Sequence, residues 1–445
     1  MRGLTTNYLG EILETPIISS LREGLSPFEF FISVYGAMKG MIDIALKTAE
    51  AGYLTRRLVE ASQTIIISVS DCQTTTGLLV EENDKFSLAK RIYGRYLASD
   101  IYNDKKEVIL TRNTLVLENE IKIIKKEKVN TICIRSPLNC ELVENICQKC
   151  YGLDLSKVGE EVKIGVAVGI IAAQSLGEPG TQLTMRTFHG GGISGEEDIT
   201  QGLPKVKEIF DNVKPEKGEK AILAKKTGKI ISIEEDAVRQ KDQAGKDIIY
   251  SLSNKKNVRV NQGDMVKKGN KITRGRINLE EYLEITGRDI CQNYIKEEIR
   301  NVYSNQGIDI NEKHIEIFAR QMLSRVKIED GGDSDYLIGD IVNYQKVQKI
   351  NQSLIKDGKK PIDFKNTISS LKDLASTPES FLAGISFQNT IKSLINYSLY
   401  NPIDYLKGAK ESLIVGQLIP IGEGFTEREK YSKLAKKRVS EKSFF

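Results

Sequence analysis

Three cysteines, Cys140, Cys147 and Cys150, are the residues whose type and spacing most directly indicate chemistry. Thiolates separated by two residues can bind one tetrahedral ion, because a tight turn brings both sulfurs to the same side. A fourth cysteine would close the coordination shell, which is typical of a structural zinc site rather than a hydrolytic one. The spacing leaves two upstream candidates for this fourth ligand, Cys72 and Cys133.

Composition narrows the function classes without choosing among them. Six cysteines in 445 residues disfavour a secreted disulfide scaffold. If the cysteines do not bind zinc, the alternative is that they are unrelated free thiols of a protein in a reducing compartment. A free-standing zinc hydrolase is disfavoured, since four thiolates leave no open position and the chain has only two histidines. The net charge of +5 is too small to identify a nucleic-acid binder. No apolar run reaches the roughly 18–20 residues of a membrane span, so we expect no membrane association.

Helical periodicity predicts one unusually long helix, from Pro27 to about Gln63. Its length would be roughly 55 Å at about 1.5 Å per residue. Ser26, Pro27 and Glu29 have the spacing of a capping box with proline at the first helical position. Glycines inside the pattern indicate either close packing in a core or a helix that bends or accepts a ligand against its backbone.

The other elements follow from shorter patterns. Short β elements are predicted in 64–135 around the cysteines, and strands of a small barrel or sandwich in 220–275, including 229–233 and 258–260. The glycine-rich stretch 177–192 predicts the tip of a hairpin that can change conformation. Further helices are predicted from Asp198 to about Asp211, Leu279 to about Tyr303, Glu312 to Val326, and Pro378 to about Tyr397, the last with Thr377 as N-cap.

The predicted hairpin segment resembles a segment of a known protein family. Residues 172–189, AAQSLGEPGTQLTMRTFH, closely resemble the trigger loop of the largest (beta-prime) subunit of bacterial-type multisubunit RNA polymerase. LREGLS at 21–26, KTA at 47–49 and GYLTRRLV at 52–59 look like the bridge helix of that subunit. The remaining similar segments are RSPL at 135–138, ITQGLP at 199–204, DINEKHI at 309–315, SF at 380–381, SFQ at 386–388, IVG at 414–416 and LIP at 418–420. The resemblance runs from Met1 to about Phe425.

The patterns and the resemblance together predict an α+β fold made of several elements. We expect a lead-in and bridge helix at 1–63, a mixed β region with the zinc-binding segment at 64–163, the trigger-loop helical hairpin at 164–213, a small β barrel or sandwich at 214–276, a C-terminal helical body with the switch region at 277–424, and a basic tail at 425–445.

The resemblance also implies roles for individual residues. It implies one structural Zn²⁺, with Cys72 as the fourth ligand. In the trigger loop, it implies that Met185 covers the base, that Arg186 and His189 face the triphosphate, and that Gln182 helps to read the sugar. His189 is implied as a proton donor or as a stabiliser of negative charge. Without the resemblance, a lone histidine before three glycines reads as an exposed turn residue.

On the bridge helix, the resemblance implies that Thr48 and Ala49 lie under the templating base, where small side chains leave room. Arg56 and Arg57 read as phosphate contacts, with a solvated helix face as the alternative. Three departures from the family pattern are Met38 where arginine is usual, Ile44 where threonine is usual, and Gly190 where threonine is common.

The family's metal-binding loop, Asn-Ala-Asp-Phe-Asp-Gly-Asp, is absent from this sequence. We therefore expect a partner chain to supply the catalytic Mg²⁺, either because the gene is split, as for the beta-double-prime subunit of plastids and cyanobacteria, or because this is a fragment. The implied partners are the beta, alpha, omega and sigma subunits, the N-terminal part of beta-prime, template DNA, the RNA transcript and nucleoside triphosphates, in the bacterial cytoplasm or the plastid stroma. The alternative function is a zinc-stapled nucleic-acid-binding or assembly module without a catalytic role.

Overall fold

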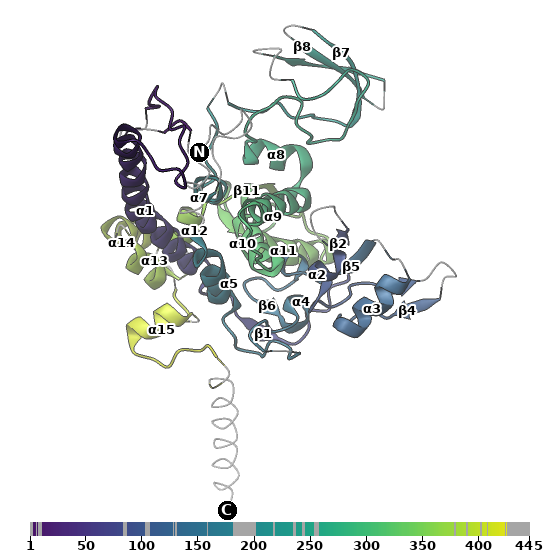
Figure 1. Ribbon diagram of the computed structural model, residues 1–445. Coiled ribbons are helices and arrows are strands. Elements are labelled where there is room, and N and C mark those ends of the chain that lie inside the picture. Colours follow the sequence, from purple (N-terminus) through teal and green to yellow (C-terminus); the bar gives the residue numbers. More distant parts are fainter. Residues whose placement is uncertain are drawn as a thin grey trace, which may run out of the picture.

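The protein is described by a computed structural model that combines helices with several small sheets (Figure 1), which confirms the predicted α+β class. The structure describes residues 3–5, 7, 11–82, 87–102, 107–127, 129, 131–157, 159–180, 202–216, 219–234, 237–242, 245–252, 258–377, 380–388, 390–400, 403–406, 408–422 and 424.

The long helix α1 spans Pro27–Ser62, as the periodicity predicts. Its capping box is formed: the Ser26 hydroxyl accepts from the Glu29 amide at 3.2 Å, and the Glu29 carboxylate accepts from the Ser26 amide at 3.0 Å. Backbone hydrogen bonds from Ser26 and then Ser19 lower the pKa of Glu29 to about 2. The C-terminal half of α1 is buried at Leu54 and Leu58, whereas the N-terminal half exposes most of its apolar side chains.

Helix α5 (Val168–Gly177) crosses the C-terminal half of α1 at very close range. The Ser62 hydroxyl donates to the Gly169 carbonyl at 2.9 Å, and a Cβ added at Gly169 would lie 2.0 Å from the Ser62 carbonyl oxygen. A Cβ at Gly177 would meet the Thr55 side chain at 2.2 Å. The absence of a side chain at these two glycines is therefore what allows the two backbones to approach each other.

The cysteine-bearing region contains the short β elements that the sequence predicts. Its strands are β1 (Ile67–Val69), β2 (Leu78–Glu81), β3 (Ile101–Tyr102), β4 (Val108–Leu110), β5 (Thr131–Ile134) and β6 (Ile146–Cys147). Strand β1 pairs with β6 in parallel, while β2 pairs with β5 and β3 with β4 in antiparallel fashion. The helical segments between them are α2 (Leu88–Ile92), α3 (Glu118–Lys126), the 3₁₀ turn η1 (Pro137–Asn139) and α4 (Gln148–Tyr151).

A four-stranded antiparallel sheet stands at one end of the molecule, next to α8 (Figure 1). Its order is β10-β7-β8-β9, with the bounds β7 Gly228–Ile233, β8 Ala237–Asp242, β9 Asp247–Ser251 and β10 Met265–Val266. Among the described strands, β9 and β10 remain its two edges, so the sheet is open and the predicted barrel is not closed. Val258, which we expected in a strand, makes only an isolated bridge to Thr273.

The C-terminal body differs from its predicted helices in three places. The helix predicted over Leu279–Tyr303 is divided into α8 (Leu279–Thr286) and α9 (Arg288–Asn305), because Gly287 has a φ of +90°. Helix α10 (Glu312–Met322) ends before the predicted Val326, because the following residues form β11 (Arg325–Asp330) between β12 (Ile341–Asn343) and β13 (Asp363–Asn366). The other elements are α7 (Leu203–Phe210), α11 (Tyr344–Lys356), α12 (Leu371–Ser376), α13 (Phe381–Phe387), α14 (Thr390–Tyr400) and α15 (Ala409–Val415).

The third difference is at the predicted N-cap of the last long helix. Thr377 is instead the C-cap of α12, and its hydroxyl donates to the Asp373 carbonyl at 2.7 Å. Ser380 caps α13, accepting from the Ala383 amide at 3.2 Å. The prediction of one helix reaching Tyr397 is therefore wrong, because two separate helices, α13 and α14, cover this stretch.

Helix α10 lies at the centre of the body, packed against α5 and α9. It is unusual because Glu312, Lys313, His314, Glu316 and Arg320 are all buried. Each charged member has a partner from a distant segment. The contacts are Glu312 with Arg91 at 2.7 Å, Glu316 with Arg95 at 2.9 Å and with the Ser136 hydroxyl at 2.8 Å, and Lys313 with the Leu153 carbonyl at 2.7 Å. These contacts connect α10 to the cysteine-bearing region.

The close crossing of α1 and α5 predicts opposite effects for two glycine substitutions. Gly169→Ala should lower the free energy of unfolding by about 1–3 kcal/mol, because the new methyl group overlaps the backbone of α1. Gly52→Ala, also in a helix, should raise it by about 1 kcal/mol, because the added Cβ meets nothing within 4 Å. Urea unfolding of both variants checks this, and a stable Gly169→Ala protein would contradict the described crossing.

Buried His314 predicts a measurable pH dependence of stability. Burial, and then the charges of Lys313 and Arg95, lower the pKa of His314 to about 3. An unfolded histidine has a pKa near 6.5, so below that pH the unfolded chain binds a proton that His314 in the folded chain does not bind. The free energy of unfolding therefore falls as the pH falls below about 6.5.

Between pH 7 and pH 5 the wild type should therefore lose about 2 kcal/mol more stability than His314→Gln. Urea titrations of both proteins at the two pH values measure this, with the metal content checked at each. Equal pH dependence in the two proteins would show that His314 is not held neutral.

Candidate metal centre

The fold brings together four cysteines from two distant parts of the chain. Parallel pairing of β1 with β6, with Val69 opposite Cys147, places the turn after β1 beside the Cys147–Cys150 turn. The Sγ atoms of Cys72, Cys140, Cys147 and Cys150 all lie within 4.8 Å of one another, and those of Cys72 and Cys150 are 3.6 Å apart. Cys72 is therefore the cysteine that completes the set.

The geometry of this cluster fits a tetrahedral ion. Sulfurs bound at about 2.3 Å to one Zn²⁺ would be about 3.8 Å apart, close to the separation that the cluster already has. All four cysteines are free of disulfides, and Cys140, Cys147 and Cys150 are buried. Hydrogen bonding to Cys140 and then Cys150 lowers the pKa of Cys147 to about 7, and the Cys150 amide donates to the Cys147 sulfur at 3.3 Å. These contacts favour the thiolate form of Cys147, which is the form that binds metal.

The two remaining cysteines lie elsewhere. Cys133 is in β5, facing Gly77, whose added Cβ would be 2.5 Å from the Cys133 sulfur. Cys291 is fully buried in α9. Burial raises the pKa of both thiols, to about 12 for Cys291. Both are therefore inert, neutral thiols that take no part in the cluster.

Two arginines that the spacing analysis did not single out surround the cluster. The Arg135 guanidinium is fully buried and lies within hydrogen-bonding distance of three of the sulfurs. Buried Arg320 of α10 donates to the carbonyls of Cys140 and Leu142 and, at 3.1 Å, to that of Asn145. Arg135 lies in the RSPL motif, five residues before Cys140, which is a local signal. Arg320 has no such signal, because it arrives from a helix 180 residues further along the chain.

The nucleic-acid-binding residues predicted on the long helix differ in their exposure to solvent. Thr48, Ala49 and Arg56 are exposed on α1, and the Arg56 guanidinium lies 5.6 Å from the centre of the Phe387 ring. Arg57, by contrast, is buried, forms an ion pair with Asp211 and lies over the Tyr53 ring. The predicted phosphate contact of Arg57 stays a prediction, and in this structure the Arg57 charge is paired with Asp211 inside the protein.

The residues predicted in the trigger loop, Gln182, Met185, Arg186 and His189, lie outside the described residues. The segments on either side of them are described, and both are held against α1. On the N-terminal side, Gly177 of α5 contacts Thr55. On the C-terminal side, Lys207 of α7 lies 4.0 Å from Glu50, and Asp211 pairs with Arg57. The described residues on both sides of this segment therefore lie beside the same helix.

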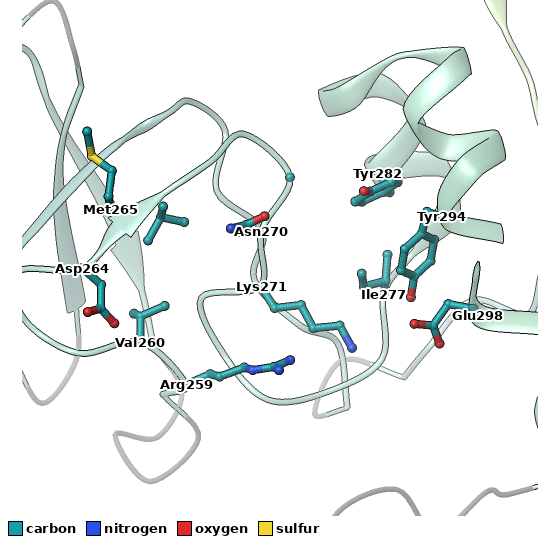
Figure 2. A pocket seen from close by; sticks show the side chains of 12 residues that line it. Arg259, Val260, Asp264, Met265, Asn270, Lys271, Ile277, Tyr282, Tyr294 and Glu298 are labelled. Atoms are coloured by element: carbon teal, nitrogen blue, oxygen red, sulfur yellow. The ribbon is translucent and has the colours of Figure 1, made fainter. Parts of the chain in front are cut away.

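A separate hollow of about 600 Å³ lies between the small sheet and helices α8 and α9 (Figure 2). Its wall includes Tyr282 and Tyr294, whose ring centres are 4.8 Å apart. The charged side chains that line it are Arg259, Lys271, Asp264 and Glu298. With two cations and two acids, the lining favours neither an anion nor a cation.

Among the described residues, no helix combines the length and apolar character needed to cross a membrane.

Comparison with known proteins places the chain in a family. Residues 24–385 match the family described as RNA polymerase Rpb1, domain 5. The chain is 46% identical to a protein of Caldicellulosiruptor saccharolyticus and 44% identical to one of Mesoplasma florum, each named DNA-directed RNA polymerase subunit beta'. These matches cover 96% and 98% of this chain but 37% and 36% of the relatives. The chain belongs to the RNA polymerase Rpb1 domain 5 family and spans little more than a third of the length of these relatives.

The cysteine cluster predicts a metal content that depends on particular sulfurs. Wild-type protein should contain one equivalent of zinc, and Cys72→Ser or Cys147→Ser should remove most of it and lower thermal stability, because a three-sulfur site is incomplete. Cys133→Ser is the matched control and should keep the metal. Elemental analysis measures the zinc content of the wild type and of the three variants. Full zinc occupancy in Cys72→Ser would contradict the assignment.

Proposed function

We propose that this chain supplies the C-terminal portion of the largest subunit of a DNA-directed RNA polymerase, with α1 as its bridge helix and 164–213 as its trigger-loop region. The observation that carries the proposal is the anchoring of both ends of this region on α1, through Gly177 at Thr55 and Asp211 at Arg57. A loop held in this way can fold and unfold over one face of α1 while its base stays fixed.

The loop residues would act on the incoming nucleoside triphosphate. Met185 would cover the base, Gln182 would contact the sugar, and Arg186 and His189 would face the triphosphate. Closure excludes water and aligns the reacting groups, so a correct nucleotide completes the site better than a wrong one. His189 would donate a proton to the leaving pyrophosphate or stabilise its charge.

The exposed face of α1 would receive the template. Thr48 and Ala49 are exposed and small, which suits contact with a base pair, and Arg56 is an exposed cation near the same face. Arg57 has a different role in this proposal. Its buried ion pair with Asp211 ties the end of α7 to α1 and so positions the loop instead of touching nucleic acid.

The four cysteines would hold one structural Zn²⁺. When bound, the ion would cross-link the turn after β1 to the Cys140–Cys150 segment, and four thiolates leave it no open position for a substrate. Its contribution is therefore to folding. Arg320 of α10 donates hydrogen bonds to carbonyls of the zinc segment, and these bonds fix the segment to the helical body.

The catalytic Mg²⁺ of nucleotide addition, which proceeds by a two-metal mechanism, would be held by residues outside this sequence. Among the described residues, the four cysteines are the one group of three or more metal-ligating side chains that comes together. The partners would be the N-terminal part of the beta-prime subunit and the beta, alpha, omega and sigma subunits, acting on template DNA, the transcript and nucleoside triphosphates. The compartment would be the bacterial cytoplasm or, for a plastid form, the stroma.

A second candidate function is an assembly module without a catalytic role. It is favoured by the apolar side chains that α1 and the C-terminal helices expose, including Phe28 at 62%, Met41 at 73% and Ile391 at 78% of their surface. Such patches mark contacts with other chains. Both candidates require partners, but only the first requires the trigger-loop side chains.

The two candidates differ in the effect of trigger-loop substitutions. In a reconstituted polymerase, His189→Ala and Arg186→Ala should each slow single-nucleotide addition roughly 100-fold, because each removes a charge-stabilising or proton-donating group. Rapid-quench measurement of one addition step gives the rates. His314→Gln, which changes the other histidine of the chain, is the matched control and should leave the rate unchanged. Wild-type rates in both loop variants would favour the assembly module.

A further inference from the structure

Arg135 occupies a special position in the cysteine cluster. Its Nη2 atom lies 3.4 Å from the Cys72 sulfur, 3.6 Å from that of Cys147 and 3.5 Å from that of Cys150. The same guanidinium donates to the Asp71 carboxylate at 2.7 Å and to the Asn113 side-chain oxygen at 2.9 Å. The Arg135 side chain is only 1% exposed, so these contacts take the place of water.

The charge of the site explains why a cation is needed there. Four thiolates around one Zn²⁺ carry a net charge of −2, and a buried charge is costly unless it is paired. Arg135 and Arg320 supply two buried positive charges near the cluster, while Lys149 pairs with Asp71 at 3.0 Å.

The two arginines differ in what they touch. Arg320 donates to backbone carbonyls and to Gln345, and so acts on the shape of the cysteine loop. Arg135 donates to the sulfurs themselves. An N–H group that donates a hydrogen bond to a sulfur withdraws electron density from that sulfur, which lowers its nucleophilicity.

We propose that Arg135 is the charge-balancing donor of the metal centre, which makes the sulfurs of Cys72, Cys147 and Cys150 less reactive toward other reagents so that the zinc stays bound. This inference rests on the zinc assignment and is independent of the polymerase role. A guanidinium suits this task better than an ammonium group, because its planar fork reaches several acceptors at once.

The test measures zinc release from the full 445-residue chain. Iodoacetamide is added, each zinc-bound sulfur that forms a C–S bond displaces iodide, and the freed zinc is followed with a chromogenic chelator. The variants are Arg135→Gln and Arg135→Lys. Three controls separate charge from packing. Asn113→Gly removes the contact at Nη1 while keeping the positive φ of 63°, Asp71→Asn removes the paired carboxylate, and Arg112→Gln replaces an exposed arginine that contacts Thr74.

Arg135→Gln should release zinc about tenfold faster than wild type, and Arg135→Lys should lie between the two. Asn113→Gly, Asp71→Asn and Arg112→Gln should stay within about twofold of wild type. If Arg135→Gln does not fold, the faster release expected of Arg135→Lys decides the question. Release at the wild-type rate in the Arg135 variants, or equally fast release in Asn113→Gly, would overturn the inference. A wild-type chain without zinc would overturn the metal assignment, and this inference with it.

Discussion

The pairing of buried charges on α10 is the constraint on which the rest of the structure depends. A carboxylate or ammonium group taken out of water is tolerated only when a partner of opposite charge or a hydrogen-bonding group meets it. On α10 these partners come from other segments: Arg91 and Arg300 for Glu312, Arg95 and Ser136 for Glu316. The cysteine-bearing region must therefore dock on α10 in one register, because any other would leave charges unpaired.

This docking connects the metal centre to the long helix. Arg320 reaches from α10 into the Cys140–Asn145 loop, and the Gln321 side chain of the same helix contacts the Ala61 carbonyl at the end of α1. Helix α5 is sandwiched in this arrangement, with Tyr303 of α9 donating to the Leu176 carbonyl at 2.8 Å. The described base of the proposed trigger loop is thus held by contacts on several sides.

Local sequence rules predicted the elements that local interactions control. The capping box of α1 needs only Ser26 and Glu29, so its start was predictable to the residue. The break at Gly287 and the cap at Ser380 were missed, because a glycine can also continue a helix and Thr377-Pro378 imitates a helix start.

The candidate site was only partly predictable for the same reason. Spacing could not choose between Cys72 and Cys133, because the choice depends on the pairing of β1 with β6 across almost eighty residues. The resemblance to the polymerase subunit implied Cys72, which is the cysteine that the fold brings into the cluster. The buried ion pair between Arg57 and Asp211 was not predictable either, because a contact between residues so far apart leaves no mark in the local sequence.

The central claim is that this chain supplies the bridge helix and trigger loop while residues outside this sequence hold the catalytic metal. The most direct test is reconstitution of transcription with the N-terminal part of beta-prime and this chain supplied as separate polypeptides, together with the other polymerase subunits. The account predicts template-directed RNA synthesis only when both polypeptides are present. Synthesis by this chain alone, or full synthesis by an assembly that lacks it, would contradict the account.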